Sequence, residues 1–349
     1  MVTKVQIADI PILLKNVDFL KILTPIETQL IKPFLIKNKF TNLNKRGFLV
    51  NFKAYSNIRR RHNGYKASHT LIKKIKSFFP NTKDIRFKRD FFVFTKRLLS
   101  FYLLDNRQNY KRVNRLINSN YSRIVFNRHS FVIFDCKSKS TNIVYMPIVM
   151  RQRRSVLYRW PYHLNVMKLF FRALLSYQKD GILLHASSLE IGGLGLVFIG
   201  QGNSGKSTVV KLLRPDRTLS DETTVIRKIN NTYKAFPNPW WNGYGIRNIN
   251  IHNPQKPVRL KALFFIKKSK DKTSLRKLEF KEALSMLIYI DHSFQQCGLW
   301  DNKIGIKECY LFFYDLLKSI PAFQLNIKKG RKFKEDFLVL LNKHFKENG

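Results

Sequence analysis

Acidic residues and cysteines are scarce in this 349-residue sequence, and long uncharged apolar runs are missing from it. No stretch of 18 apolar residues is free of charge, so we predict no transmembrane helix. The first residues lack the charged segment, apolar segment and small-residue cleavage site of a secretory signal. The three cysteines, Cys136, Cys297 and Cys309, are widely spaced and odd in number. They predict buried thiols rather than a disulfide framework or a zinc site, and we expect a reducing, cytoplasmic location.

The shortage of acids gives the chain a formal net charge of +43, from 65 Lys and Arg against 22 Asp and Glu. Residues 1–180 hold 37 basic and 8 acidic side chains, whereas residues 181–349 hold 28 and 14. Such a field attracts polyanions, so RNA, DNA, an acidic protein surface and an anionic membrane face are the partners to consider. The alternative is a coding bias toward lysine, which does not account for the scarcity of acids or for the run Arg59–Arg61.

The chain is long enough for two domains, and its 44% hydrophobic content predicts globular cores. The segment up to about residue 120 mixes helical patterns with short strands. Helices are expected at 69–79 and 90–106. Three apolar runs in Ser122–Ile148 predict a β-meander, and Trp160–Gly181 has the pattern of a helix. We therefore expect a basic α+β region over 1–155 and a second, α/β domain over 156–349.

The stretch "GQGNSGKST", Gly200–Thr208, matches the pattern G-x-x-x-x-G-K-[ST] of a phosphate-binding loop. Strands are expected at 182–191 and 194–199 and a helix at 207–213, which is the strand–loop–helix context that such a loop requires. The glycines let successive backbone N–H groups point at phosphate oxygens, and the helix N-terminus adds its dipole. The residues expected to bind the nucleotide are Gly200, Gly202, Asn203, Ser204, Gly205, Lys206, Ser207 and Thr208. Among them, Lys206 would reach the β- and γ-phosphates, and the Ser207 hydroxyl would coordinate Mg²⁺.

Carboxylates follow this loop unusually soon. Many proteins with such a loop carry an acidic residue at the end of a later apolar strand, but the run Leu260–Ser269 ends in lysines. Asp221 and Glu222 instead follow Lys206 by about fifteen residues, at the start of a β-branched run. A carboxylate there can hold Mg²⁺ or take a proton from an attacking hydroxyl. We expect Ser207, Asp221 and Glu222 to be the metal ligands.

The segment "LLHASSLEIGGLGLVFIGQGNSGKSTVVKLL", with the later "RTLSDETTVIRK", resembles the catalytic domain of HPr kinase/phosphorylase and its shorter kinase-like relatives. The resemblance spans about 160–345 and implies a phosphoenolpyruvate-carboxykinase-like α/β fold with a mixed sheet. It also implies that His185, Asp221 and Glu222 lie near the transferred phosphate, with Asp221 as the base. Glu222 stands where an aspartate is more usual. Thr208 stands where the bifunctional enzymes carry glutamate, and the sequence has no counterpart of their downstream signature, so phosphorylase activity stays open.

Taken together, these patterns predict an enzyme, a kinase that uses ATP and Mg²⁺ to phosphorylate a hydroxyl of a protein, a peptide or a small molecule. Catalysis is assigned to Asp221, His185 and Lys206, although an isolated His185 would more often be a core residue. The alternatives are an RNA- or ribosome-associated nucleotide-binding protein with a retained kinase-like domain, and a nucleic-acid kinase. Trp240 and Trp241 either cover the ligand or pack. The acceptor and the oligomeric state stay open, and a homo-oligomer is among the partners considered.

Overall fold

The computed structural model describes the chain in several ranges, which cover most of its second half. They are 2–15, 31–32, 35, 48–54, 122–126, 130–135, 140–145, 167–168, 171–172, 174–175, 178–213, 217–241, 256–295, 306–328, 330 and 332–346. The helices expected at 69–79 and 90–106, the run Arg59–Arg61, Cys136 and Cys297 lie outside the described residues. Cys309 is a buried thiol, as expected.

The N-terminal part contains a six-stranded mixed sheet in the order β1-β2-β3-β6-β5-β4. Its strands are β1 (Val2–Ile7), β2 (Ile10–Lys15), β3 (Phe48–Ala54), β4 (Ser122–Phe126), β5 (Ser130–Asp135) and β6 (Ser140–Tyr145). The last three strands pair antiparallel in succession, which confirms the predicted meander. Strand β3 is parallel to both of its neighbours, so this sheet is mixed rather than a simple meander.

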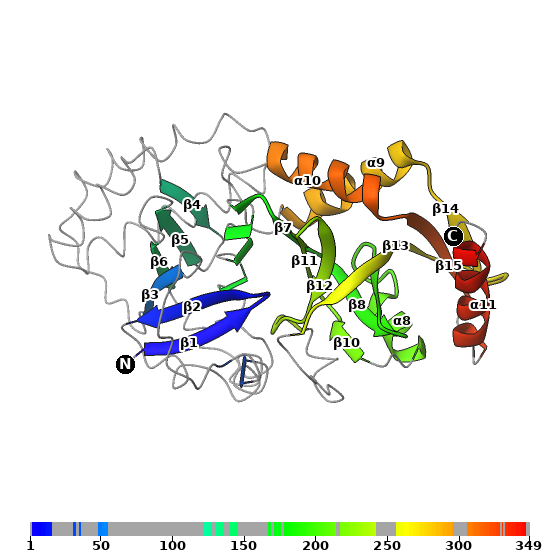
Figure 1. Ribbon diagram of the computed structural model, residues 1–349, viewed down its shortest axis with the longest axis horizontal. Coiled ribbons are helices and arrows are strands. Elements are labelled where there is room, and N and C mark those ends of the chain that lie inside the picture. The colour runs from blue at the N-terminus through cyan, green and yellow to red at the C-terminus, as the bar shows by residue number, and fades with distance from the viewer. Residues whose placement is uncertain are drawn as a thin grey trace, which may run out of the picture.

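The C-terminal part contains a nine-stranded mixed sheet flanked by helices (Figure 1). Its strands are β7 (Gly181–Leu184), β8 (Ala186–Ile191), β9 (Leu194–Ile199), β10 (Arg217–Ser220), β11 (Thr224–Ile229), β12 (Thr232–Phe236), β13 (Val258–Lys268), β14 (Ser274–Lys277) and β15 (Ala322–Ile327). Its helices are α8 (Lys206–Leu213), α9 (Phe280–Gln295), α10 (Ile306–Ser319) and α11 (Phe333–Lys346). All of the described residues between 167 and 178 are helical, in agreement with the helix expected over Trp160–Gly181.

The C-terminal sheet curls because two stretches of chain, residues 181–191 and β13, pair with different strands at their two ends. Strands β7 and β8 are one stretch of chain broken at His185, yet β7 pairs with β11 whereas β8 pairs with β9 and β10. Strand β13 pairs with β9 along one edge, while its beginning pairs with β12 and its end with β15 along the other. The order β10-β8-β9-β13-β12-β11-β7 therefore begins and ends close to the same break in the chain. The predicted α/β class with a mixed sheet is confirmed.

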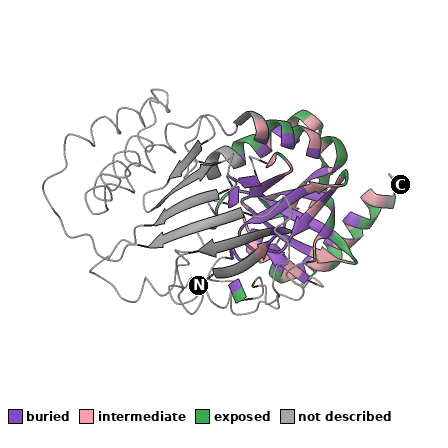
Figure 2. Ribbon diagram, turned by 60° about the vertical axis from the view of Figure 1, so that its left-hand side comes forward, coloured by how far each residue is buried: buried purple, intermediate pink, exposed green. Residues whose placement is uncertain are grey.

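Hydrophobic side chains on the two faces of this sheet form two cores. Helices α9 and α10 contribute to the core that contains Leu263 and Phe265, and α8 and α11 contribute to the core that contains Phe264. This alternation along β13 is the two-residue period of a strand buried on both faces. Phe264 stacks in register on Phe198 and Phe323, with centroids 5.1 Å and 5.6 Å away. Figure 2 shows the buried residues concentrated in the strands and the exposed ones on the outer sides of the helices.

One buried arginine ties the first hairpin to the C-terminal sheet. Arg227, on β11, is 4% exposed; it donates to the carbonyl oxygen of Ala8 at 2.6 Å and pairs with Asp180. Ala8 and Asp9 form the left-handed turn between β1 and β2, so this turn is the part of the hairpin that Arg227 holds. The Nη1 and Nη2 atoms of Arg227 make these two bonds, which offset part of the cost of burying its charge. None of the helices in the described part of the chain combines the length and apolarity of a membrane span.

Candidate functional site

The glycine-rich loop turns tightly between β9 and α8. The amide of Ser204 donates to the carbonyl of Gln201 at 3.2 Å, and the amide of Val209 donates to that of Gly205 at 2.9 Å, where the helix begins. Asn203 and Gly205 have φ angles of +62° and +106°, in the region that L side chains rarely adopt. The φ of Gly205 suits glycine alone, whereas asparagine tolerates the milder value. Asparagine and glycine at these two positions explain why the chain turns into a loop here rather than extending β9.

Lys206 lies inside this loop. Its ammonium donates to the carbonyl oxygens of Gly200 at 2.7 Å and Gln201 at 2.8 Å, and the residue is 6% exposed. Burial lowers the pKa of Lys206 to about 8, while Glu222 acts in the opposite direction. The ammonium is therefore charged at neutral pH. A Cβ on Gly200 would lie 2.4 Å from Ser204 Oγ, so the loop has no space for a side chain at that position.

The two acids lie in a turn between β10 and β11 that contacts the start of α8. The Ser220 hydroxyl accepts bonds from the amides of Glu222 at 3.4 Å and Thr223 at 3.2 Å, which closes the turn. The Ser207 hydroxyl donates to the backbone carbonyl of Asp221 at 3.4 Å. Asp221 is 4% exposed. The first turn of α8 and the acid pair are thus adjacent, although Ser207 meets the backbone of Asp221 rather than its carboxylate.

His185 occupies the break between β7 and β8, and its Nε2 lies 3.6 Å from Glu222 Oε1. Burial lowers the pKa of His185 to about 4, assisted by the positive charges of Lys206 and Lys168, while Glu222 acts in the opposite direction. The imidazole is therefore neutral at pH 7, and its contact with Glu222 is not an ion pair under those conditions. The expected single strand over 182–191 was wrong at this one residue, because the chain changes partner there from β11 to β9.

Two residues that the sequence did not single out complete this cluster. Lys168 donates to the Thr223 hydroxyl at 3.1 Å and adds a second positive charge beside His185. Asn238 is fully buried and donates to the carbonyl of Thr223 at 2.6 Å, which fixes the residue after the acids. A lysine in an amphipathic helix and an asparagine next to proline carry no motif. Only the tertiary structure places them here.

The tryptophan pair is part of the core. Trp240 is 2% and Trp241 is 4% exposed. The Trp240 ring packs on Phe171 with centroids 5.1 Å apart, and the Trp241 indole donates to the carbonyl of Asn238 at 2.7 Å. Of the two interpretations of these side chains, packing is the one that this geometry supports.

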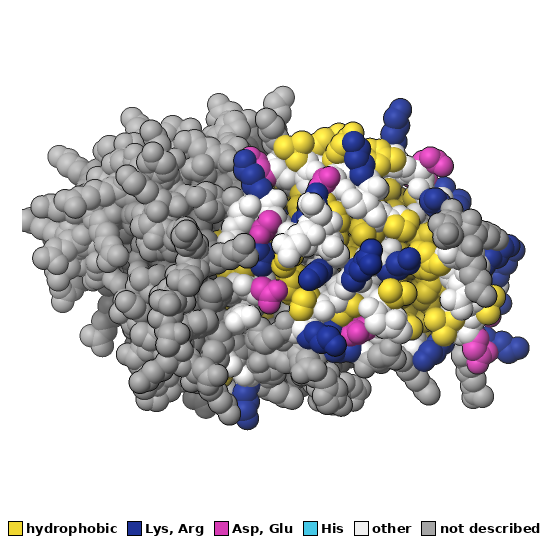
Figure 3. Space-filling model, viewed as in Figure 1, with side chains coloured by type: hydrophobic (Ala, Val, Ile, Leu, Met, Phe, Trp, Pro, Cys, Tyr) yellow, Lys and Arg dark blue, Asp and Glu magenta, His cyan; other side chains and the backbone are white. Residues whose placement is uncertain are grey.

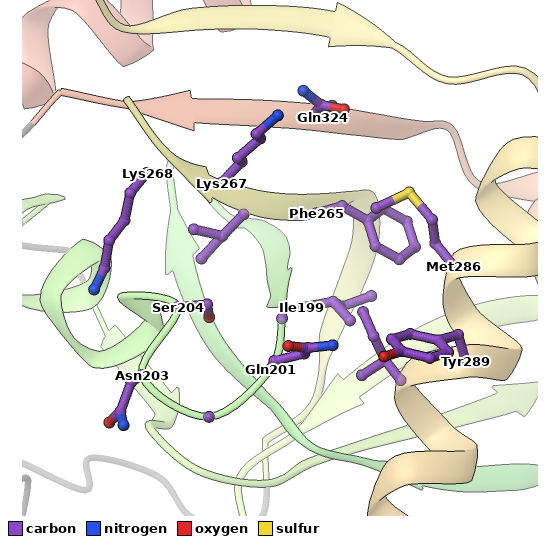
Figure 4. Close-up of a pocket in the computed structure, with 14 residues that line it drawn as sticks. Ile199, Gln201, Asn203, Ser204, Phe265, Lys267, Lys268, Met286, Tyr289 and Gln324 are labelled. Carbon is purple, nitrogen blue, oxygen red and sulfur yellow. The ribbon is translucent and has the colours of Figure 1, made fainter. Parts of the chain in front are cut away.

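A cavity of about 510 Å³ lies beside the loop (Figure 4). Its lining comes from Gly200–Ser204, from the end of β13 and from the side of α9 that carries Met286 and Tyr289. Gln324 on β15 also contributes. The cavity lies where the parallel strands β9 and β13 end, which is where ligands of open α/β sheets commonly bind.

The residues predicted from the sequence therefore fall into one neighbourhood. His185, Lys206, Ser207, Asp221 and Glu222 come together through the contacts described above. The remaining loop residues differ in exposure: Gly202 and Asn203 are exposed, and Ser204, Gly205 and Thr208 are half-buried. Within the ranges that the structure describes, no group of three or more His, Cys, Asp or Glu side chains is arranged to hold a metal ion.

These elements define an α/β protein in which a glycine-rich loop, an acidic turn and a half-buried histidine meet beside a curled mixed sheet. The chain belongs to the family described as SynChlorMet cassette protein ScmC, whose family model matches residues 162–341, more than half of the chain. No curated protein matches the sequence. One similar solved structure is described as "Structure of the Hpr(Ser) kinase/phosphatase from Coxiella burnetii". It is 15% identical, the match covers 47% of this chain and 91% of that one, and the TM-score is 0.29, a likeness that carries no argument about activity.

Proposed function

We propose that the chain binds ATP with Mg²⁺ at Gly200–Thr208 and transfers the γ-phosphoryl group to a hydroxyl of a peptide, a protein or a small molecule. The observation that carries the proposal is the meeting of Lys206, Ser207 and Asp221 at the start of α8 with a neutral His185 beside Glu222. Phosphoryl transfer needs positioning and charge neutralisation more than covalent chemistry, and this group of residues supplies both.

The loop suits a triphosphate in shape and charge. A side chain at Gly200 would meet Ser204, and Gly205 has a φ of +106°, so glycine at both positions permits the tight turn by which such loops direct backbone amides at phosphate oxygens. The Lys206 ammonium already lies within the loop, where it donates hydrogen bonds to two carbonyl oxygens. In the bound state its ammonium would exchange these for the β- and γ-phosphate oxygens.

The acidic turn suits metal binding and proton transfer. Mg²⁺, when bound, would neutralise charge on the β- and γ-phosphates, and Ser207 with Asp221 or Glu222 would hold it alongside the phosphate oxygens. The acceptor oxygen would form its bond to the γ-phosphorus as the bond to the β-phosphate oxygen breaks. ADP leaves with that electron pair, and the acceptor proton passes to the Asp221 carboxylate. Neutral His185 can donate an N–H to a phosphate oxygen or tune the neighbouring carboxylates.

The decisive experiment separates binding from transfer. Purified full-length protein is incubated with γ-labelled ATP, Mg²⁺ and cell extract, and ATP binding is measured separately. Lys206→Ala should lose both binding and label transfer. Asp221→Asn should keep binding within a fewfold and lose transfer by roughly 10²- to 10⁴-fold, the usual contribution of a positioned base.

Lys211→Ala is the matched control, because Lys211 is an exposed lysine in the last turn of the same helix. It should match the wild type in both measurements. Label transfer that is equal in wild type and Asp221→Asn would contradict the assignment of Asp221. Absence of both ATP binding and variant-sensitive transfer would refute the kinase proposal.

The basic N-terminal part carries the second candidate. We propose that the chain divides near residue 155, because the two sheets, as far as their strands are described, use residues 2–145 and 181–327 and share no strand. The observation that favours a polyanionic partner is the excess of 37 basic over 8 acidic side chains in residues 1–180. On the face of the C-terminal part seen in Figure 3, Lys and Arg side chains are scattered with acidic ones between them, rather than gathered in one patch. Salt-dependent RNA binding that survives both Lys206→Ala and Asp221→Asn would support this second function.

A further inference from the structure

The cavity beside the glycine-rich loop has a second wall whose chemistry the proposed phosphate contacts do not use. Its volume of about 510 Å³ is within the usual range for small-molecule sites and exceeds what a phosphate group needs. The loop Gly200–Ser204 lines it directly, so a ligand whose phosphates enter the loop can place its remaining part in this space without crossing another element.

The wall opposite the loop is apolar and aromatic. Tyr289 on α9 is 61% exposed and borders the cavity, while Phe265 and Ile290 are buried behind it. Met286 supplies a thioether, which adapts well to the face or edge of an aromatic ring. Figure 4 shows the Gln201 side chain pointing from the loop toward Tyr289, with Phe265 and Met286 around the same space. Such a wall offers stacking and dispersion to a flat ring.

Among the described residues that line the cavity, none is acidic. Their polar side chains are those of Gln201, Asn203, Ser204, Lys267, Lys268, Tyr289 and Gln324. Gln324 is already held, because its Nε2 donates to Asn326 at 3.0 Å and its Oε1 accepts from Arg276 at 3.1 Å. Gln201, in contrast, is an exposed amide that offers both donors and an acceptor. An acidic side chain would accept hydrogen bonds from the N–H groups of guanine, whereas adenine presents a different set of donors and acceptors. The Gln201 amide can turn either its oxygen or its nitrogen toward the base, so it does not discriminate between guanine and adenine.

We propose that this cavity holds the nucleoside end of the triphosphate, with the base stacked against Tyr289, and that it accepts adenine and guanine alike. The inference rests on the proposed triphosphate binding at Gly200–Thr208. Lys267 and Lys268, which are exposed at the end of β13, line the same cavity and add positive charge to it. The competing occupant is the hydroxyl acceptor, and the experiment distinguishes the two.

Binding of ATP, GTP and inorganic tripolyphosphate is measured by calorimetry on full-length wild type, Tyr289→Ala and Tyr289→Phe. Stacking of a base on an aromatic ring predicts a loss of roughly tenfold in ATP and GTP affinity for Tyr289→Ala. Tyr289→Phe should retain wild-type affinity, and tripolyphosphate affinity should be the same in all three proteins. The wild-type affinities for ATP and GTP should agree within about fivefold, less than a single good base contact provides.

Tyr310→Ala is the matched control, since Tyr310 is a 42% exposed tyrosine on α10 that does not line the cavity. It should leave all three affinities unchanged, and the thermal midpoint of Tyr289→Ala should match that of the control. Unchanged ATP affinity in Tyr289→Ala, with or without a raised KM for the acceptor, would overturn the nucleoside assignment while the kinase proposal stands. A preference of a hundredfold for either purine would overturn the claim of equal acceptance. Failure of the wild type to bind both ATP and tripolyphosphate would refute the inference together with the proposed function.

Discussion

The neutral histidine at the break between β7 and β8 makes a quantitative prediction about pH. The pKa of His185 is lowered from 6.5 to about 4, and its side chain is 22% exposed. At 1.36 kcal/mol per pKa unit, this shift corresponds to about 3 kcal/mol of folding free energy. The unfolded chain binds the proton near pH 6.5, whereas the folded chain resists it until about pH 4. The contribution is therefore fully present above pH 6.5 and is lost as the pH falls toward 4.

Replacing His185 by glutamine removes this titration and keeps a side chain of similar polarity. We expect the stability difference between wild type and His185→Gln to change by about 3 kcal/mol between pH 7 and pH 4, in the direction that disfavours the wild type at low pH. Urea unfolding of both proteins at several pH values measures it, since contributions of the other titrating groups largely cancel in the difference. NMR titration of the histidine ring protons gives the pKa directly, with the variant assigning the resonance.

Two further variants test the cause of the shift rather than its size. Lys168→Met removes a positive charge and should raise the pKa of His185, whereas Glu222→Gln removes a negative charge and should lower it. A His185 resonance that titrates near 6.5 in the wild type would show that the imidazole is solvated, which would refute burial as the cause. Shifts of the His185 pKa in one direction in both variants would refute the assigned effects of the two neighbouring charges.

Three other predictions concern the loop and the hairpin. Because burial lowers the pKa of Lys206 to about 8, calorimetry should show the affinity for tripolyphosphate falling as the pH rises from 7.5 to 9.5, in the wild type and in Lys211→Ala alike; a constant affinity would contradict this. Gly200→Ala should abolish triphosphate binding while Gly202→Ala keeps it within a fewfold, since a Cβ meets Ser204 Oγ at the first position and nothing within 4 Å at the second; equal affinities would contradict this. Arg227→Met should speed hydrogen exchange in residues 2–15 by tenfold or more, measured by mass spectrometry, because the Ala8 carbonyl loses a charged donor; unchanged exchange would show that the hairpin is held by other contacts.

The parts of the fold that the sequence predicted well are those with local signals. The strand 194–199, the glycine-rich loop and the following helix were confirmed within a residue, because apolar runs, glycines and helix periodicity lie within one short window. Strand β10 was not predicted: its four residues have no clear alternation, and it forms because Arg217 pairs with Glu190 on β8 at 2.9 Å and also donates to the carbonyl of Lys256. Helix α10 was also missed, although its buried side chains follow a helical pattern.

The candidate site divides in the same way. The loop residues and the acid pair were identified from motif and spacing. Lys168 could not be, because its position beside His185 depends on how the helix over 167–178 packs and on the turn that contains Thr223. The break at His185 could not be predicted either, since it results from the pairing of β7 with β11, a strand some forty residues later. The catalytic and metal-binding roles remain predictions that the variants above test.

The position of β13 between β9 and β12 affects how the protein is made. His185, Lys206 and Asp221 all leave the ribosome before Val258–Lys268, the strand that separates β9 from β12. The second half of β13, past its pairing with β12, finds its partner only in Ala322–Ile327, close to the end of the chain. High contact order of this kind slows folding and leaves strand edges exposed during synthesis. A nascent chain that stops at residue 241 thus carries every residue of the loop and the acidic turn but lacks β13, the strand that pairs with β9 before the loop. Fragments of this length should aggregate rather than bind phosphate.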